Sequence, residues 1–323
     1  MNAKDRFLSR KWGVFNHFIE PIQNNPEILN SYGKTTDWNT LVNEFDVELV
    51  AKTLNEIGAG YYVFTVMQGT KHMVAPNKTF DKIAGTKPGE ACSHRDLIED
   101  LYQALKKYDI DLFLYFTGDG PYKNHPEGDR FGFVEPRHVG VTKDFVEKWA
   151  SVLEEYAVRY GDKVKGWWID GCYKRAHKYT DELLEIFYKA CKKGNPNALV
   201  AMNGGDVQEG DFCLGYINDD FLCGEQGYIE KVPKKRFYGS AQAHTLIPIG
   251  VTPQDGSMSD LIQETCWPGW GCFGLIKPKE FILDFVKRCN EVGAVVSIDI
   301  GVYRDGKYDP IQVEALKYLN ENL

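Results

Sequence analysis

Short apolar stretches alternate with longer amphipathic stretches along most of the chain. The apolar stretches carry hydrophobic residues at successive positions, which is typical of parallel strands buried on both faces. The stretches that predict strands are 12–18, 61–67, 111–117, 164–169, 198–203 and 294–300, with weaker patterns at 221–223 and 237–241. The chain therefore holds about eight predicted strands.

The amphipathic stretches carry apolar residues at helical spacing and are bounded by recognisable caps. Ser93 is placed to cap one helix, with Asp96 three residues on, and Thr142 caps another. Gly58 is a favourable end for the first helix, and Pro278 suits a first helical turn. The stretches that predict helices are 46–57, 93–108, 142–160, 180–193, 278–292 and 310–320.

Strands that alternate with helices predict a parallel sheet joined by right-handed crossovers. A single α/β domain over residues 1–323, folded as a (β/α)₈ TIM-type barrel, suits both the strand number and the length. A doubly wound open sheet is the alternative, but no Gly-x-Gly-x-x-Gly follows the first strand. We expect long loops at the C-terminal face, of which 118–141 is the longest and shows no periodicity.

Charge and hydropathy exclude two kinds of partner. The net charge is −8 and no basic run is present, so we expect no nucleic-acid binding. No apolar stretch approaches the roughly 20 residues that span a bilayer, so we expect no membrane insertion. The N-terminus lacks the apolar segment of a secretory signal, which indicates a cytoplasmic protein, or a periplasmic or secreted one whose signal was removed.

The 8 cysteines show neither Cys-x-x-Cys spacing nor a zinc-type cluster with histidine. We therefore expect free thiols in a reducing compartment and no metal site. An even number of cysteines leaves disulfides open for a secreted protein.

Barrel enzymes place their reactive groups at the C-terminal ends of the strands, and Asp170 stands at such an end. Side chains alternate along a strand, so Trp168 and Asp170 share one face while Trp167 and Ile169 share the other. An indole beside a carboxylate desolvates it, which suits nucleophilic or proton-transfer chemistry. The structural alternative is a turn, because Asp-Gly is a common turn pair.

One reaction open to a carboxylate at a barrel mouth is glycoside hydrolysis, which requires a second carboxyl group. Glu225, which follows a weakly predicted strand, is the candidate for that second group. A solvated loop glutamate is the structural alternative, and Asp219, Asp220, Asp255 and Glu264 are rivals. Trp267 and Trp270 lie in a Gly/Pro-rich stretch that suits either a sugar platform or loop packing. Other polar residues near strand ends are Asn16, His17, Gln68, His72, Thr117, Asp119, His125, Asn203, Gln242, His244 and Asp299.

Several stretches together resemble the catalytic barrel of the α-L-fucosidase family of retaining glycosidases. They are 11–18 (KWGVFNHF), 44–46 with 58–65 (GAGYYVFT), 94–97 with 112–117, His125-Pro126, 160–171 (YGDKVKGWWIDG), and 293–301 (GAVVSIDIG) with Asp305-Gly306. The resemblance implies that Asp170 is the nucleophile, that Glu225 is the acid/base and that His17 binds the substrate.

The chain departs from the family pattern after the second strand. Two adjacent histidines followed by Asp-Gly usually hold the fucose hydroxyls there, whereas this chain has Met67-Gln68-Gly69-Thr70. Gln68 can still hydrogen-bond a hydroxyl, and His72 is placed to assist. The β-sandwich that many members append is absent from the sequence given.

These observations predict a retaining exo-glycoside hydrolase that removes a terminal, fucose-like sugar without a metal or organic cofactor. We expect the carbohydrate substrate to be held by His17, Gln68, His72, Trp168, Asn203 and Trp267. One alternative is an inactive carbohydrate-binding barrel that lacks the acid/base, and another is a barrel lyase or isomerase that needs convergent metal ligands. The sequence leaves the oligomeric state open.

Overall fold

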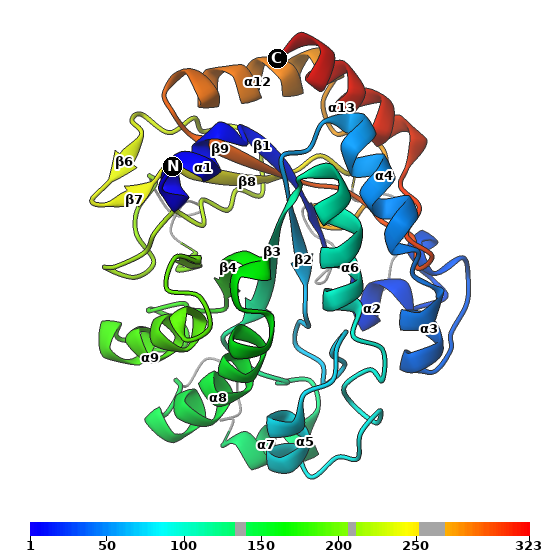
Figure 1. Cartoon of the computed structure of the whole chain (residues 1–323), viewed down its shortest axis with the longest axis vertical. Coiled ribbons are helices and arrows are strands. Elements are labelled where there is room, and N and C mark those ends of the chain that lie inside the picture. The colour runs from blue at the N-terminus through cyan, green and yellow to red at the C-terminus, as the bar shows by residue number, and fades with distance from the viewer. Residues whose placement is uncertain (133–139, 206–210, 252–268) are drawn as a thin grey trace.

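The computed structural model describes residues 1–132, 140–205, 211–251 and 269–323. Seven parallel strands form one curled sheet in the order β5-β4-β3-β2-β1-β9-β8, with helices packed around its outer face (Figure 1). The strands are β1 (Trp12–Asn16), β2 (Tyr61–Thr65), β3 (Asp111–Thr117), β4 (Val164–Asp170), β5 (Leu199–Met202), β8 (His244–Pro248) and β9 (Val295–Asp299). The predicted α/β barrel fold is confirmed.

An irregular segment, residues 219–226, occupies the eighth position of the barrel between β5 and β8. The Asp220 amide donates to the Val200 carbonyl of β5 at 2.8 Å. On the other side, the Leu246 amide of β8 donates to the Gly224 carbonyl at 3.0 Å. The weakly predicted strand 221–223 therefore holds the position of a strand but makes only isolated bridges.

The strand predicted at 237–241 is wrong as a barrel strand. Two short antiparallel strands, β6 (Phe237–Tyr238) and β7 (Ala241–Gln242), form a separate hairpin there. The barrel strand in this region is β8, which the sequence analysis missed. Its sequence, HTLIP, begins with a histidine and ends with a proline, so it carries little of the apolar pattern of the other strands.

The helices begin and end close to the predicted positions, with one cap misassigned. Asp46 caps α4, which ends at Gly58 with φ of +78°, and Thr142 caps α8. Asp96, not Ser93, caps α6, because the Asp96 side chain accepts the Glu99 amide. The longer helices are α4 (Val47–Ile57), α6 (Leu97–Leu105), α8 (Lys143–Tyr160), α9 (Asp181–Lys192), α12 (Lys279–Glu291) and α13 (Pro310–Asn322).

Shorter helices were not predicted, and one of them lies in the stretch expected to be a loop. That helix is α7 (His125–Phe131), which begins at the His125-Pro126 pair. A helix of seven residues is too short to show a clear apolar period. The others are α1 (Ala3–Ser9), α2 (Glu20–Gln23), α3 (Trp38–Glu44) and α5 (Lys78–Ala84).

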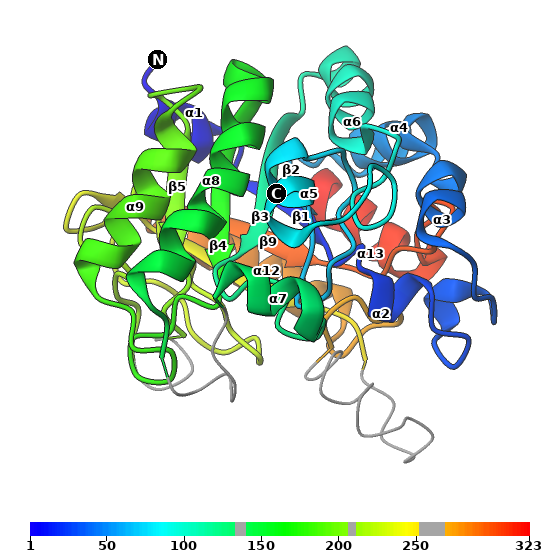
Figure 2. The same ribbon diagram turned by 90° about the horizontal axis from the view of Figure 1, so that it is seen from below.

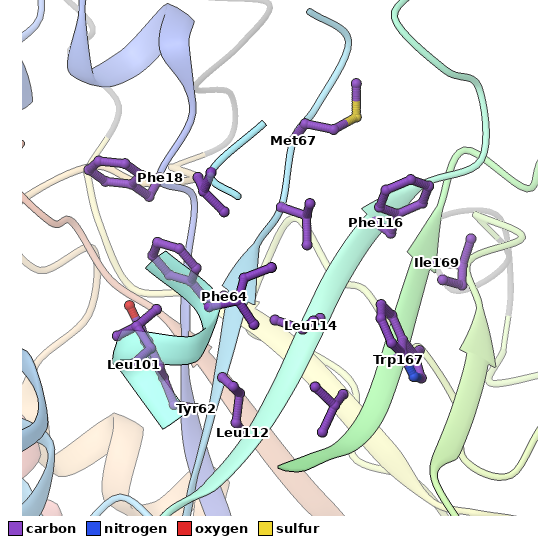
Figure 3. Close-up of a cluster of buried hydrophobic side chains, with 14 of the residues drawn as sticks. Phe18, Tyr62, Phe64, Met67, Leu101, Leu112, Leu114, Phe116, Trp167 and Ile169 are labelled. Carbon is purple, nitrogen blue, oxygen red and sulfur yellow. The ribbon is translucent and has the colours of Figure 1, made fainter. Parts of the chain in front are cut away.

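The strands separate two cores. Outward-facing side chains such as Trp167 and Ile169 pack against the helices in the large outer core shown in Figure 3. Inward-facing side chains, among them Trp168, fill the barrel interior. Phe7 of α1 closes the N-terminal end, with its ring 5.1 Å from that of Tyr61. Figure 2 shows α1 at one end of the barrel and α2 and α7 at the other.

No described helix is long and apolar enough to cross a bilayer. The described cysteines, at 92, 172, 191, 213, 223, 272 and 289, are free thiols. Cys266 lies outside the described residues.

Candidate active site

Asp170 ends β4 and turns into the interior at the C-terminal end of the barrel, as the alternation predicted. Its carboxylate is 9% exposed and accepts hydrogen bonds from three side chains. The Tyr115 hydroxyl donates to Oδ2 at 2.6 Å, while Asn203 Nδ2 and the Tyr173 hydroxyl donate to Oδ1 at 2.8 and 3.3 Å. These donors hold the carboxylate in one orientation.

Trp168 lies one pleat below Asp170, and its ring stacks on that of Tyr115 at 5.4 Å. Its side chain is 2% exposed. Tyr115 therefore covers one face of the Trp168 indole, which was predicted to contact the substrate. Trp168 instead supports the ring whose hydroxyl binds Asp170.

Glu225 comes from the irregular segment 219–226 and meets Asp170 through Asn203. The same Asn203 Nδ2 that donates to Asp170 also donates to Glu225 Oε2. Burial, together with the nearby Asp170 charge, raises the pKa of Glu225 to about 7. A carboxyl group with this pKa exists in both protonation states near neutral pH, which suits general acid and base work.

His17 follows β1 and lies at the same end of the barrel, beside the ring that donates to Asp170. Its Nδ1 is 2.7 Å from Oδ2 of Asp299, the last residue of β9. Its ring centroid lies 6.0 Å from that of Tyr115 and 5.6 Å from that of Trp270. The structure thus brings together His17, Asp170, Asn203 and Glu225, which the sequence analysis placed on four different segments.

Gln68 and His72 both follow β2 and are half-buried. The His72 ring packs on Trp38 of α3 at 5.4 Å, and none of its described contacts is with Asp170, Asn203 or Glu225. Burial lowers the pKa of His72 to about 4, so this imidazole is neutral. Trp267 lies outside the described residues.

The rival carboxylates have other roles or are not described. Asp219 accepts the backbone amides of Met202 and Tyr216, and Asp220 pairs with Lys192 at 2.6 Å. Both therefore brace the segment that carries Glu225. Asp255 and Glu264 lie outside the described residues.

Three functional side chains were given no role from the sequence. Tyr115 and Tyr173 bind Asp170, and Asp299 binds His17. The register pairs Tyr115 of β3 directly with Trp168 of β4. Tyr115 therefore lies on the same face of the sheet as Asp170, and strand alternation could have identified it as a neighbour of the site. Nothing in the local sequence marks Tyr173, which lies in the loop after β4.

Within the described parts of the chain, no three His, Cys, Asp or Glu side chains come together as metal ligands. The carboxyl pair, its bridging amide and the aromatic surroundings make an arrangement that can attack and protonate a substrate.

Comparison with solved structures finds the same fold in carbohydrate-active enzymes. An α-L-fucosidase of family GH29 from Bacteroides thetaiotaomicron is 18% identical with a TM-score of 0.67, over 99% of this chain and 74% of that one. An α-L-fucosidase solved with Fuca(1,6)GlcNAc is 17% identical with a TM-score of 0.63, over 99% and 97%. An endo-fucoidan hydrolase of glycoside hydrolase family 107 is 14% identical with a TM-score of 0.67, and this chain spans 53% of it.

At these identities the solved structures establish the fold alone, and no curated protein sequence matches the chain. The family assignment comes from the sequence model of the alpha-L-fucosidase family, which matches residues 29–323. That range includes β2 to β9 and both carboxyl groups of the site. The chain belongs to the alpha-L-fucosidase family and is a glycosidase.

Proposed function

We propose that the protein is an exo-acting α-L-fucosidase-like hydrolase that removes a terminal, fucose-like sugar by double displacement with retention. Asp170 attacks the anomeric carbon and forms a glycosyl ester, while Glu225 protonates the departing oxygen. Glu225 then removes a proton from the water that cleaves the ester.

The observation that carries the proposal is the shared donor Asn203. Because one Nδ2 donates to both carboxyl groups, their nearest oxygens are separated by no more than about 6 Å, the sum of two hydrogen-bond lengths. Retaining glycosidases separate their carboxyl groups by about 5–5.5 Å and inverting ones by about 6.5–9.5 Å. This upper limit on the separation of the two carboxyl groups favours direct attack by Asp170 over attack by a water held between them.

The electrostatics also fit the two steps. The Asp170 charge helps to raise the pKa of Glu225, which keeps Glu225 protonated for the first step. Esterification of Asp170 removes that charge, so the pKa of Glu225 falls and the carboxylate becomes a base for the second step. Among the solved neighbours, the Bacteroides enzyme was captured as a trapped covalent intermediate, which agrees with this course.

The test is hydrolysis of aryl glycosides, namely α-L-fucoside, β-D-galactoside, α-L-galactoside and β-L-arabinoside, by the wild type and Asp170→Asn. We expect turnover of the α-L-fucoside, a first product of retained configuration by proton NMR, and loss of turnover in Asp170→Asn. Asp284→Asn, which changes an exposed carboxylate of α12 paired with Arg288, is the control and is expected to stay active. An inverted first product, or a fully active Asp170→Asn, contradicts the mechanism.

A further inference from the structure

The His17–Asp299 pair lies beside the two carboxyl groups and has no part in the steps above. Asp299 is fully buried, and both of its oxygens are in use. Oδ2 lies 2.7 Å from His17 Nδ1, and Oδ1 accepts the Gly271 amide at 2.6 Å. The two partners are 282 positions apart in the chain, so the contact exists only in the closed barrel.

This geometry decides which His17 nitrogen carries the proton. An ionised carboxylate has acceptors only, so an ionised Asp299 receives its hydrogen bond from Nδ1, and Nδ1 is then the N–H donor. The remaining ring nitrogen, Nε2, has no hydrogen-bond partner among the described residues. Nε2 of the neutral ring is therefore an acceptor that needs an O–H or N–H group.

The His17 ring stands at the substrate opening. It lies near the ring of Trp270 on one side and that of Tyr115, the Asp170 donor, on another. It is also close enough to Glu225 to interact electrostatically with that carboxyl. The His17 ring is therefore one of the groups that surround Asp170 and Glu225.

We propose that Asp299 is a positioning residue that holds His17 with Nε2 directed at the sugar and fixes that atom as the acceptor of one sugar hydroxyl. The proposal rests on the glycosidase function proposed above. It makes a free hydroxyl at that position of the ring a requirement for productive binding, because only a hydroxyl supplies the proton that Nε2 accepts.

Asp299→Asn tests the idea because asparagine has one acceptor oxygen where aspartate has two. If that oxygen still accepts the hydrogen bond from the Gly271 amide, the asparagine NH₂ faces His17 Nδ1. Nδ1 must then accept a hydrogen bond from that NH₂. The proton moves to Nε2, and the ring presents a donor where the sugar requires an acceptor. The shape of the side chain barely changes.

The first measurement is ¹⁵N NMR of histidine-labelled protein above the titration range of imidazole, with His17→Ala used to assign the signal. We expect a protonated Nδ1 and an unprotonated Nε2 in the wild type, and the reverse in Asp299→Asn. This readout needs no substrate, and a purely structural role of Asp299 would not produce it. A wild-type His17 with an unprotonated Nδ1 overturns the proposal.

The second measurement is kcat/KM on the aryl α-L-fucoside for Asp299→Asn, His17→Ala and the double variant. We expect each single variant to lose roughly 10- to 100-fold, the usual cost of leaving one buried donor or acceptor unpaired. We expect the double variant to lose no more than His17→Ala. Losses that multiply in the double variant overturn the proposal, because Asp299 would then act independently of His17.

Asp309→Asn is the matched control. Asp309 is a buried aspartate that accepts the Gly274 amide of the same loop, and none of the histidines that the structure describes contacts it. We expect Asp309→Asn to keep the wild-type kcat/KM. An equal loss of kcat/KM in Asp309→Asn and Asp299→Asn would overturn the proposal, because the loss would then come from loop packing. If the wild type cleaves no glycoside, the proposed function fails and the sugar contact fails with it, whereas a wrong tautomer in an active enzyme refutes the role of Asp299 alone.

Discussion

Glu225→Gln is expected to stabilise the protein at alkaline pH while abolishing hydrolysis. The pKa of Glu225 is about 7 in the folded protein, against an ordinary value of 4.5. Between these two values the folded state keeps a proton that the unfolded chain has released. The free energy of unfolding therefore falls as the pH rises from about 4.5 through about 7.

The magnitude follows from the size of the shift. A rise from 4.5 to about 7 is worth about 3 kcal/mol at 1.36 kcal/mol per pH unit. Glutamine carries no charge at any pH, and its carbonyl can still accept from Asn203. The difference in stability between the variant and the wild type should be near zero below pH 4.5 and should reach about 3 kcal/mol in favour of the variant above pH 7.5.

The assay is thermal unfolding of both proteins from pH 4.5 to 8.5. For a chain of this length, about 3 kcal/mol corresponds to a difference in Tm of roughly 4 °C at the alkaline end. Glu230→Gln removes a charge from an exposed position shortly after Glu225 and controls for net charge. If the melting temperatures of the wild type and Glu225→Gln run in parallel across the whole range, Glu225 does not retain its proton in the folded protein and the prediction is refuted.

Two further predictions concern catalysis. The kcat/KM of the wild type should fall about tenfold per pH unit above about pH 7, because Glu225 must be protonated in the first step. A kcat/KM profile that stays flat to about pH 9 would contradict the role of Glu225 as the acid. Tyr115→Phe removes the 2.6 Å hydrogen bond to Asp170 and should lower kcat/KM on the aryl fucoside roughly 10- to 100-fold. Circular dichroism should show an unchanged fold. Unchanged kinetics would show that Tyr115 does not orient the nucleophile.

Local pattern was enough to predict the parts of the molecule in which neighbouring residues decide the structure. Strand parity predicted that Trp168 shares a face with Asp170 and that Trp167 lies on the other face, because side chains alternate along any strand. In the structure the first face is the barrel interior and the second is the outer core. Caps such as Gly58 and Thr142 act within a few residues, so the end of α4 and the start of α8 could be predicted as well. The position of Asp170 at the end of a parallel strand could be predicted for the same reason, because the strand pattern is local.

The sequence by itself determined the α/β class, the parallel strands and the strand end that carries Asp170, since these depend on short-range periodicity. Only the tertiary structure decided how β8 and the irregular segment 219–226 complete the barrel, because hydrogen bonds to distant strands hold them and their own sequence shows no regular pattern. Closure of the barrel alone brings Asn203 between Asp170 and Glu225 and joins His17 to Asp299. A contact between residues hundreds of positions apart depends on the geometry of the whole sheet, and no local pattern encodes it.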